Sequence, residues 1–85
     1  MFMSDQATYT LQYFAIFREQ AGMRAEQVRT HARTPRELYA ELKSRHAFRL
    51  DEAQLKVAIN NEFGDWQQTL QDGDTITFIP PVAGG

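Results

Sequence analysis

The chain has 85 residues and a formal net charge of −2, and 42% of its residues are hydrophobic. This length and composition are typical of one small folded domain. Cysteine is absent, which excludes disulfides, thiolate metal sites and cysteine nucleophiles. No segment approaches the roughly 18–20 apolar residues that span a membrane, and the first residues do not resemble a secretory signal. We therefore expect a cytoplasmic protein that binds no membrane, and the scattered basic residues argue against nucleic-acid binding.

The first third of the chain is predicted to form two strands. Residues 1–7 are expected to be mobile. Residues 8–17 are rich in β-branched and aromatic side chains and predict one long strand. Residues 18–22 predict a single helical turn that ends at Gly22, and residues 25–31 predict the second strand.

A helix start signal follows the second strand. Thr34 can act as an N-cap, Pro35 suits the first helical position, and Glu37 completes a capping box. The helix is expected to continue to Arg45 or His46.

The rest of the chain predicts short strands joined by tight turns. Residues 55–60 alternate between apolar and polar, and Asn60 with Asn61 is typical of a turn. A short strand is expected around Trp66, within residues 63–70. After the turn at Gly73, residues 75–79 form the last predicted strand. The order of elements predicts an α+β fold of the β-grasp (ubiquitin-like) type, a mixed sheet on one main helix, as a single domain over residues 1–85.

Residues 80–85 are predicted to form a functional C-terminal tail. The two prolines cannot donate to a β ladder and hold the chain extended, so they form a stiff arm. Side-chain volume then falls to nothing, and glycines without Cβ atoms can thread a narrow channel. A terminal carboxylate presented in this way could be activated with ATP and converted to a thiocarboxylate. A simple frayed end is the alternative for the two glycines alone. The tail residues are Pro80, Pro81, Val82, Ala83, Gly84 and Gly85.

This C-terminal sequence resembles that of the MoaD family, the small subunit of molybdopterin synthase. The resemblance lies in Asp72-Gly73-Asp74, then an apolar strand and Pro80-Pro81-Val82-Ala83-Gly84-Gly85. Residues 13–22 and 57–60 are also similar to the family, so the resemblance covers residues 8–85. Ala83 stands where the family often has Thr.

The resemblance implies a sulfur carrier without catalytic side chains of its own. Gly85 would be adenylated by an ATP-dependent activating enzyme, so that AMP and sulfur adducts form there transiently and no cofactor is bound. The tail would enter a large catalytic subunit and supply sulfur to cyclic pyranopterin monophosphate, in a heterotetramer of two small and two large subunits. The alternatives are a carrier of another pathway, such as thiamine synthesis, a ubiquitin-like protein modifier, or a pure interaction module.

A surface patch is predicted to dock these partners. If residues 8–17 form one strand, Phe14 and Ile16 lie on the face away from the helix, and Ile79 can join them. An exposed apolar patch on a small domain often marks such a surface, but a shift of one residue would place them in the core. Arg18 is a further candidate contact for the activating enzyme, or a solvated surface charge.

No second site is predicted elsewhere in the sequence. The two histidines, His31 and His46, have no spacing typical of metal ligands, and no metal site is expected. Asp72 and Asp74 flank Gly73 and are interpreted as turn residues.

Overall fold

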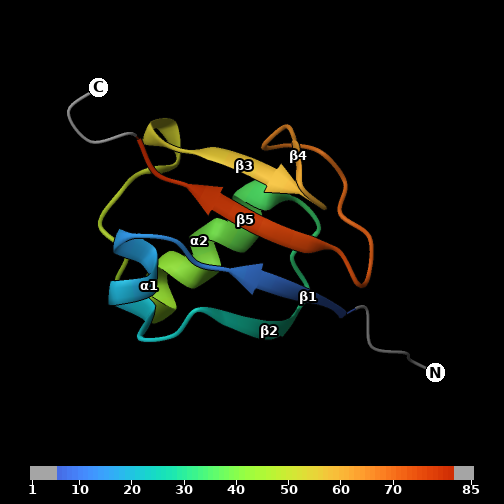
Figure 1. Cartoon of the computed structure of the whole chain (residues 1–85). Coiled ribbons are helices and arrows are strands. Elements are labelled where there is room, and N and C mark those ends of the chain that lie inside the picture. Colours follow the sequence, from blue (N-terminus) through green and yellow to red (C-terminus); the bar gives the residue numbers. More distant parts are fainter. Residues whose placement is uncertain (1–5, 82–85) are drawn as a thin grey trace.

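The computed structural model describes residues 6–81, which form a five-stranded mixed sheet with one main helix against one face (Figure 1). The strands are β1 (Ala7–Gln12), β2 (Ala25–Thr30), β3 (Lys56–Ile59), β4 (Glu62–Phe63) and β5 (Thr75–Ile79). Across the sheet their order is β2-β1-β5-β3-β4, with β1 and β5 parallel and the other neighbours antiparallel. The helical elements are α1 (Ile16–Ala21), α2 (Pro35–His46) and the 3-10 turn η1 (Glu52–Gln54). This is the predicted β-grasp fold.

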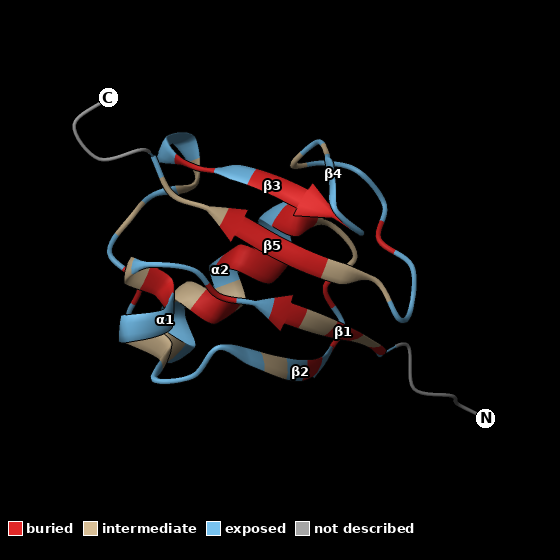
Figure 2. Cartoon of the chain, in the orientation of Figure 1, coloured by how far each residue is buried: buried red, intermediate tan, exposed pale blue. Residues whose placement is uncertain are grey.

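The hydrophobic core fills the space between the sheet and α2 (Figure 2). Alternate residues of each strand point toward the helix, as the period of two requires. The buried side chains from β1 and its end are Tyr9, Leu11 and Tyr13. Those from α2 are Leu38, Tyr39 and Leu42, and β5 adds Ile76 and Phe78.

The start of α2 confirms the predicted cap with one difference. Thr34 Oγ1 accepts a hydrogen bond from the Glu37 backbone N–H at 3.2 Å, as an N-cap should. The Glu37 carboxylate instead accepts from the backbone N–H of Arg33 at 2.7 Å, one residue before the cap. The prediction of a complete capping box is therefore wrong in its second half.

The prediction of one long first strand over residues 8–17 is wrong beyond Gln12, where β1 ends. The chain turns sharply after Phe14, because the backbone N–H of Phe17 donates to the carbonyl oxygen of Phe14 at 3.0 Å and Ala15 has a φ of 51°. Phe17 is still buried, but from α1 rather than from a strand. At the other end, Ala7 already pairs with Thr30, one residue earlier than predicted.

The predicted strand around Trp66 is also wrong. The fourth strand covers only Glu62–Phe63 and follows β3 through Asn60 and Asn61. Both asparagines have positive φ, 54° and 71°, as the tight turn of a hairpin requires. Trp66 lies after this hairpin, and its ring stacks on Phe78 at a centroid distance of 5.7 Å. Trp66 is therefore partly buried against the hydrophobic core and does not belong to a strand.

None of the helices in residues 6–81 is long and apolar enough to cross a membrane.

Candidate functional site

The strand that leads into the C-terminal tail is the central strand of the sheet. Residues 75–77 of β5 pair with residues 10–12 of β1, and residues 76–79 pair with β3. Because β1 and β5 are parallel, the last residue of β5 lies at the end of the sheet away from the start of β1 (Figure 1). Pairing with β3 therefore holds the base of the tail as far as Ile79, whereas pairing with β1 on the other side ends at Thr77.

Aromatic side chains pack against Phe78 of β5 and hold this strand in place. The Phe78 side chain is fully buried, and its ring contacts Tyr39 of α2 edge-on at 4.9 Å and Trp66 face-on. Aromatic pairs of this geometry stabilise a core beyond their buried area. The Tyr39 hydroxyl donates to the carbonyl oxygen of Leu50 at 2.6 Å, and burial raises the pKa of Tyr39 to about 12. It therefore remains a donor at neutral pH and ties the loop at Leu50 to the same aromatic cluster.

Pro80 and Pro81, here called the stem, follow β5 directly. Pro80 is half-buried and Pro81 is exposed, so the chain leaves the core within two residues. The other predicted tail residues, Val82, Ala83, Gly84 and Gly85, lie outside the described residues. Their role in sulfur chemistry stays a prediction.

A shallow apolar depression lies on the sheet face opposite α2. It has a volume of about 220 Å³ and is lined mainly by Phe14, Ala58, Phe63, Thr77 and Ile79. The side chain of Phe14 is 46% exposed and that of Phe63 is 75% exposed, although both are large hydrophobic residues. We refer to Phe14, Phe63 and Ile79 as the sheet-face patch.

The structure brings together two of the three apolar residues predicted for docking. Phe14 and Ile79 line the same depression. Ile16 does not join them, because the turn at Ala15 places it in α1, where it packs partly against the core. Arg18 is exposed on α1. Phe63 was missed, although an aromatic residue two positions after the Asn60-Asn61 turn was a usable signal of a hairpin strand, in which it pairs with Ala58.

Ile16 instead lines a separate groove beside the stem, which we call the stem groove. Its volume is about 420 Å³, and its walls come from α1, the loop after α2 and the stem. The lining residues are Ala15, Ile16, Gln20, Arg49, Leu50, Pro80 and Pro81. The groove is mostly apolar, with one amide and one cation at its edge.

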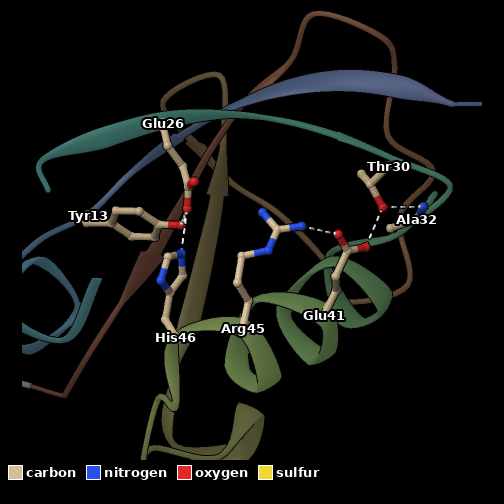
Figure 3. Close-up of polar contacts among 7 residues, drawn as sticks. All are labelled: Tyr13, Glu26, Thr30, Ala32, Glu41, Arg45 and His46. Atoms are coloured by element: carbon tan, nitrogen blue, oxygen red, sulfur yellow. Dashed lines mark hydrogen bonds and ion pairs between the residues drawn. The ribbon is translucent and has the colours of Figure 1, made fainter. Parts of the chain in front are cut away.

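A polar cluster joins β1, β2 and α2 away from the stem. The Tyr13 hydroxyl and His46 Nε2 both lie 2.6 Å from Glu26 Oε1 (Figure 3). Burial alone would raise the pKa of Glu26, but the hydrogen bonds from Tyr13 and His46 outweigh it and lower that pKa. Burial and the Glu26 carboxylate together raise the pKa of Tyr13. This cluster holds three elements together and uses His46 as a structural partner.

No group of three or more His, Cys, Asp or Glu residues within residues 6–81 is arranged to hold a metal ion. Asp72 and Asp74 serve the turn before β5, as predicted. Asp72 Oδ1 accepts from the backbone N–H of Thr8 at 2.7 Å, and Asp74 Oδ1 accepts from the Asn60 side chain at 2.9 Å. Gly73 between them has a φ of 91°, which favours glycine.

Comparison with known proteins then assigns the family. The sequence profile of the ThiS family matches residues 11–85, which include the stem and the two terminal glycines. The chain belongs to the ThiS family. The predicted resemblance to small subunits of molybdopterin synthase is also confirmed by relatives that are named molybdopterin synthase sulfur carrier subunits. The molybdopterin synthase sulfur carrier subunit of Haemophilus influenzae is 36% identical over 76 residues, 86% of this chain and 94% of the relative. That of Escherichia coli is 34% identical over the same length and coverage.

Solved structures of similar proteins share the fold of this ThiS-family chain. A provisionally assigned molybdopterin converting factor subunit 1 from Pyrococcus furiosus superimposes with a TM-score of 0.74 at 30% identity, covering 89% of this chain and 99% of that one. A Helicobacter pylori complex of subunits 1 and 2 of molybdopterin-converting factor contains a chain with a TM-score of 0.62 and 26% identity, covering 92% and 99%. The β-grasp fold is thus confirmed by comparison as well as by topology.

Proposed function

We propose that this chain is the sulfur carrier subunit of a molybdopterin synthase and that the Gly85 carboxylate is its working group. The carboxylate attacks the α-phosphate of ATP, which forms an acyl-adenylate and releases pyrophosphate. A sulfur donor then displaces AMP, and the product is a thiocarboxylate on Gly85. This sulfur is delivered to cyclic pyranopterin monophosphate while the tail lies inside a large catalytic subunit. AMP and sulfur are bound only transiently.

The family match through Gly85 is the observation that supports this proposal most strongly. The named relatives favour molybdopterin synthesis over a thiamine-type carrier, because they are molybdopterin synthase subunits. The stem adds a physical argument, since two consecutive prolines directly after the central strand have a fixed φ and stiffen the base of the tail. A frayed end needs no such support.

Two proteins are proposed as partners: an ATP-dependent adenylating enzyme and the large subunit, in a heterotetramer of two copies each. The Helicobacter pylori complex pairs a similar chain with subunit 2 of its factor, which supports the second partner. The sheet-face patch lies beside the stem and offers apolar surface to such a subunit. Arg18 on α1 is exposed and stays a candidate contact for the adenylating enzyme.

Intact mass spectrometry tests the chemistry. The protein is incubated with the adenylating enzyme, ATP and a sulfur donor, and the expected product has one oxygen replaced by sulfur, located on Gly85 by fragmentation. Omission of ATP is the control and should leave the mass unchanged. No sulfur on Gly85 in the complete reaction would contradict the proposal.

Two tail variants separate a carrier from an interaction module. Deletion of Gly85, or addition of one alanine after it, should abolish sulfur transfer in a reconstituted synthase assay and leave the melting temperature unchanged, because the last core residue within residues 6–81 is Phe78. An alanine added at the N-terminus is the matched control and should retain transfer. Full transfer by the C-terminally extended protein would show that the chain end is not the reactive group.

A further inference from the structure

We propose that the stem groove is a second contact site for the large subunit and that it positions the stem at the mouth of the catalytic pocket. The groove would receive an apolar side chain of the large subunit, a backbone or side-chain N–H directed at Gln20, and a carboxylate directed at Arg49. This inference rests on the proposed function, because it assigns a surface to the protein that receives the tail.

The reach of the tail requires the large subunit to come close to this groove. Gly85 lies four residues beyond Pro81 in the sequence. A fully extended chain of that length spans at most about 14 Å. A protein that encloses Gly85 must therefore approach Pro81, which forms one wall of the groove.

The residues of the groove also adjoin those of the sheet-face patch in the sequence. Phe14 belongs to the patch, and the next two residues, Ala15 and Ile16, line the groove. On the other side, Ile79 belongs to the patch and the stem lines the groove. Specific protein interfaces bury about 800 Å² on each partner, which three apolar side chains do not supply. A contact that begins at the patch and follows the tail passes Pro80 and Pro81, which form one wall of the groove.

Two features of the groove indicate what the large subunit supplies. Gln20 Oε1 is buried, and it is the one buried side-chain polar atom in the described chain that accepts no hydrogen bond. Because Gln20 also lines the groove, a partner that donates a hydrogen bond to this oxygen would satisfy it. Arg49 is exposed at the same rim. Within an otherwise apolar groove, these groups favour a donor and an anion beside an apolar side chain.

A residue with a strained backbone also lies at the groove. Ala15 has φ 51° and ψ −124°, a conformation that favours glycine, and its side chain lines the groove. Strained non-glycine residues cluster at ligand and partner contacts. The unpaired acceptor, the strained residue and the stem thus meet at one surface.

Binding of the large subunit to two groove variants tests the inference. Arg49→Glu and Gln20→Leu are made in the full-length protein, and the dissociation constant is measured by titration calorimetry. Each should weaken binding about tenfold, the loss of one charge-assisted or buried hydrogen bond. Arg29→Glu is the matched control for charge, because Arg29 is exposed on β2 far from the stem, and it should bind as wild type. Unchanged urea midpoints confirm that the variants fold.

Tail deletion separates the groove from the tail itself. In a protein that ends at Pro81, binding is weaker, and Arg49→Glu should weaken it further by the same factor. Wild-type affinity of both groove variants would overturn the inference, and so would a defect confined to adenylation, which would assign the groove to the other partner. Sulfur on Gly85 of the same variants, measured by mass, reports separately on the proposed function.

Discussion

The strained backbone at Ala15 predicts that a glycine at this position does not lower the free energy of unfolding, although glycine usually does. Ala15 is exposed and caps α1 with a φ of 51°, where an L-residue pays a steric penalty. Replacing it with glycine removes that penalty and no buried surface. We therefore expect Ala15→Gly to leave the free energy of unfolding unchanged or to raise it.

The magnitude follows from two opposing effects. A residue held in a sparsely populated region costs of order 1–3 kcal/mol. Glycine in turn loses more backbone entropy on folding, roughly 0.5–1 kcal/mol relative to alanine. The net expectation is a stabilisation between about 0 and 2.5 kcal/mol, and each kcal/mol corresponds to a rise in melting temperature of about 4–8 °C in a domain of this size.

The same substitution in α2 is the matched control. Ala40 is exposed in the middle of that helix, so Ala40→Gly should lower the free energy of unfolding by about 1 kcal/mol. Urea denaturation of both variants at neutral pH measures the difference. Equal destabilisation by the two substitutions would show that Ala15 is not strained and would remove one support for the stem groove.

Three further predictions concern the core, the patch and the polar cluster. Phe78→Ala should cost about 3–5 kcal/mol in urea unfolding, because it empties a fully buried aromatic site, and a cost under about 1 kcal/mol would contradict the anchoring of β5. Phe63→Ser should change stability by less than about 1 kcal/mol but weaken binding of the large subunit about tenfold by calorimetry; unchanged affinity would exclude Phe63 from the interface. The pKa of Glu26 is lower in the folded protein than the unfolded value of 4.5, so the ionised carboxylate stabilises the fold above pH 4.5. This stability is lost as the pH falls through the folded pKa. Glu26→Gln should therefore be less stable at neutral pH and show a shallower loss of urea midpoint below about pH 4.5, whereas an unchanged acid slope would refute this role.

Much of the fold could be predicted because local signals and packing agree. Thr34 and Pro35 mark the start of α2, since a cap and a first-turn proline satisfy the helix end without help from the rest of the chain. The alternating residues of β1 and β3 point inward as expected. The turn at Gly73 and the strand after it were also predicted correctly, because glycine readily adopts the positive φ that such a turn requires.

The site was predicted only in part because its decisive features are not local. Alanine carries no sign of a positive φ, so the turn at Ala15 was invisible and Ile16 was placed on the wrong surface. Phe14, which follows β1, and Phe63 of β4 line the same depression because the order of the strands places β5 and β3 between β1 and β4. The order of the strands depends on the parallel pairing of β1 with β5. These two strands are far apart in the sequence, so no local pattern of residues predicts that they pair.

The position of the stem explains why a carrier domain needs a well-packed core. Each backbone residue that must be ordered on binding costs roughly 1–2 kcal/mol in entropy, and proline has already lost most of this freedom. Two prolines that continue a strand paired with β3 up to Ile79 therefore lower the cost of placing the tail in a partner. This advantage lasts only while β5 is fixed by Phe78 and its aromatic neighbours. Loosening that cluster should weaken tail delivery even when Gly85 and its chemistry are intact.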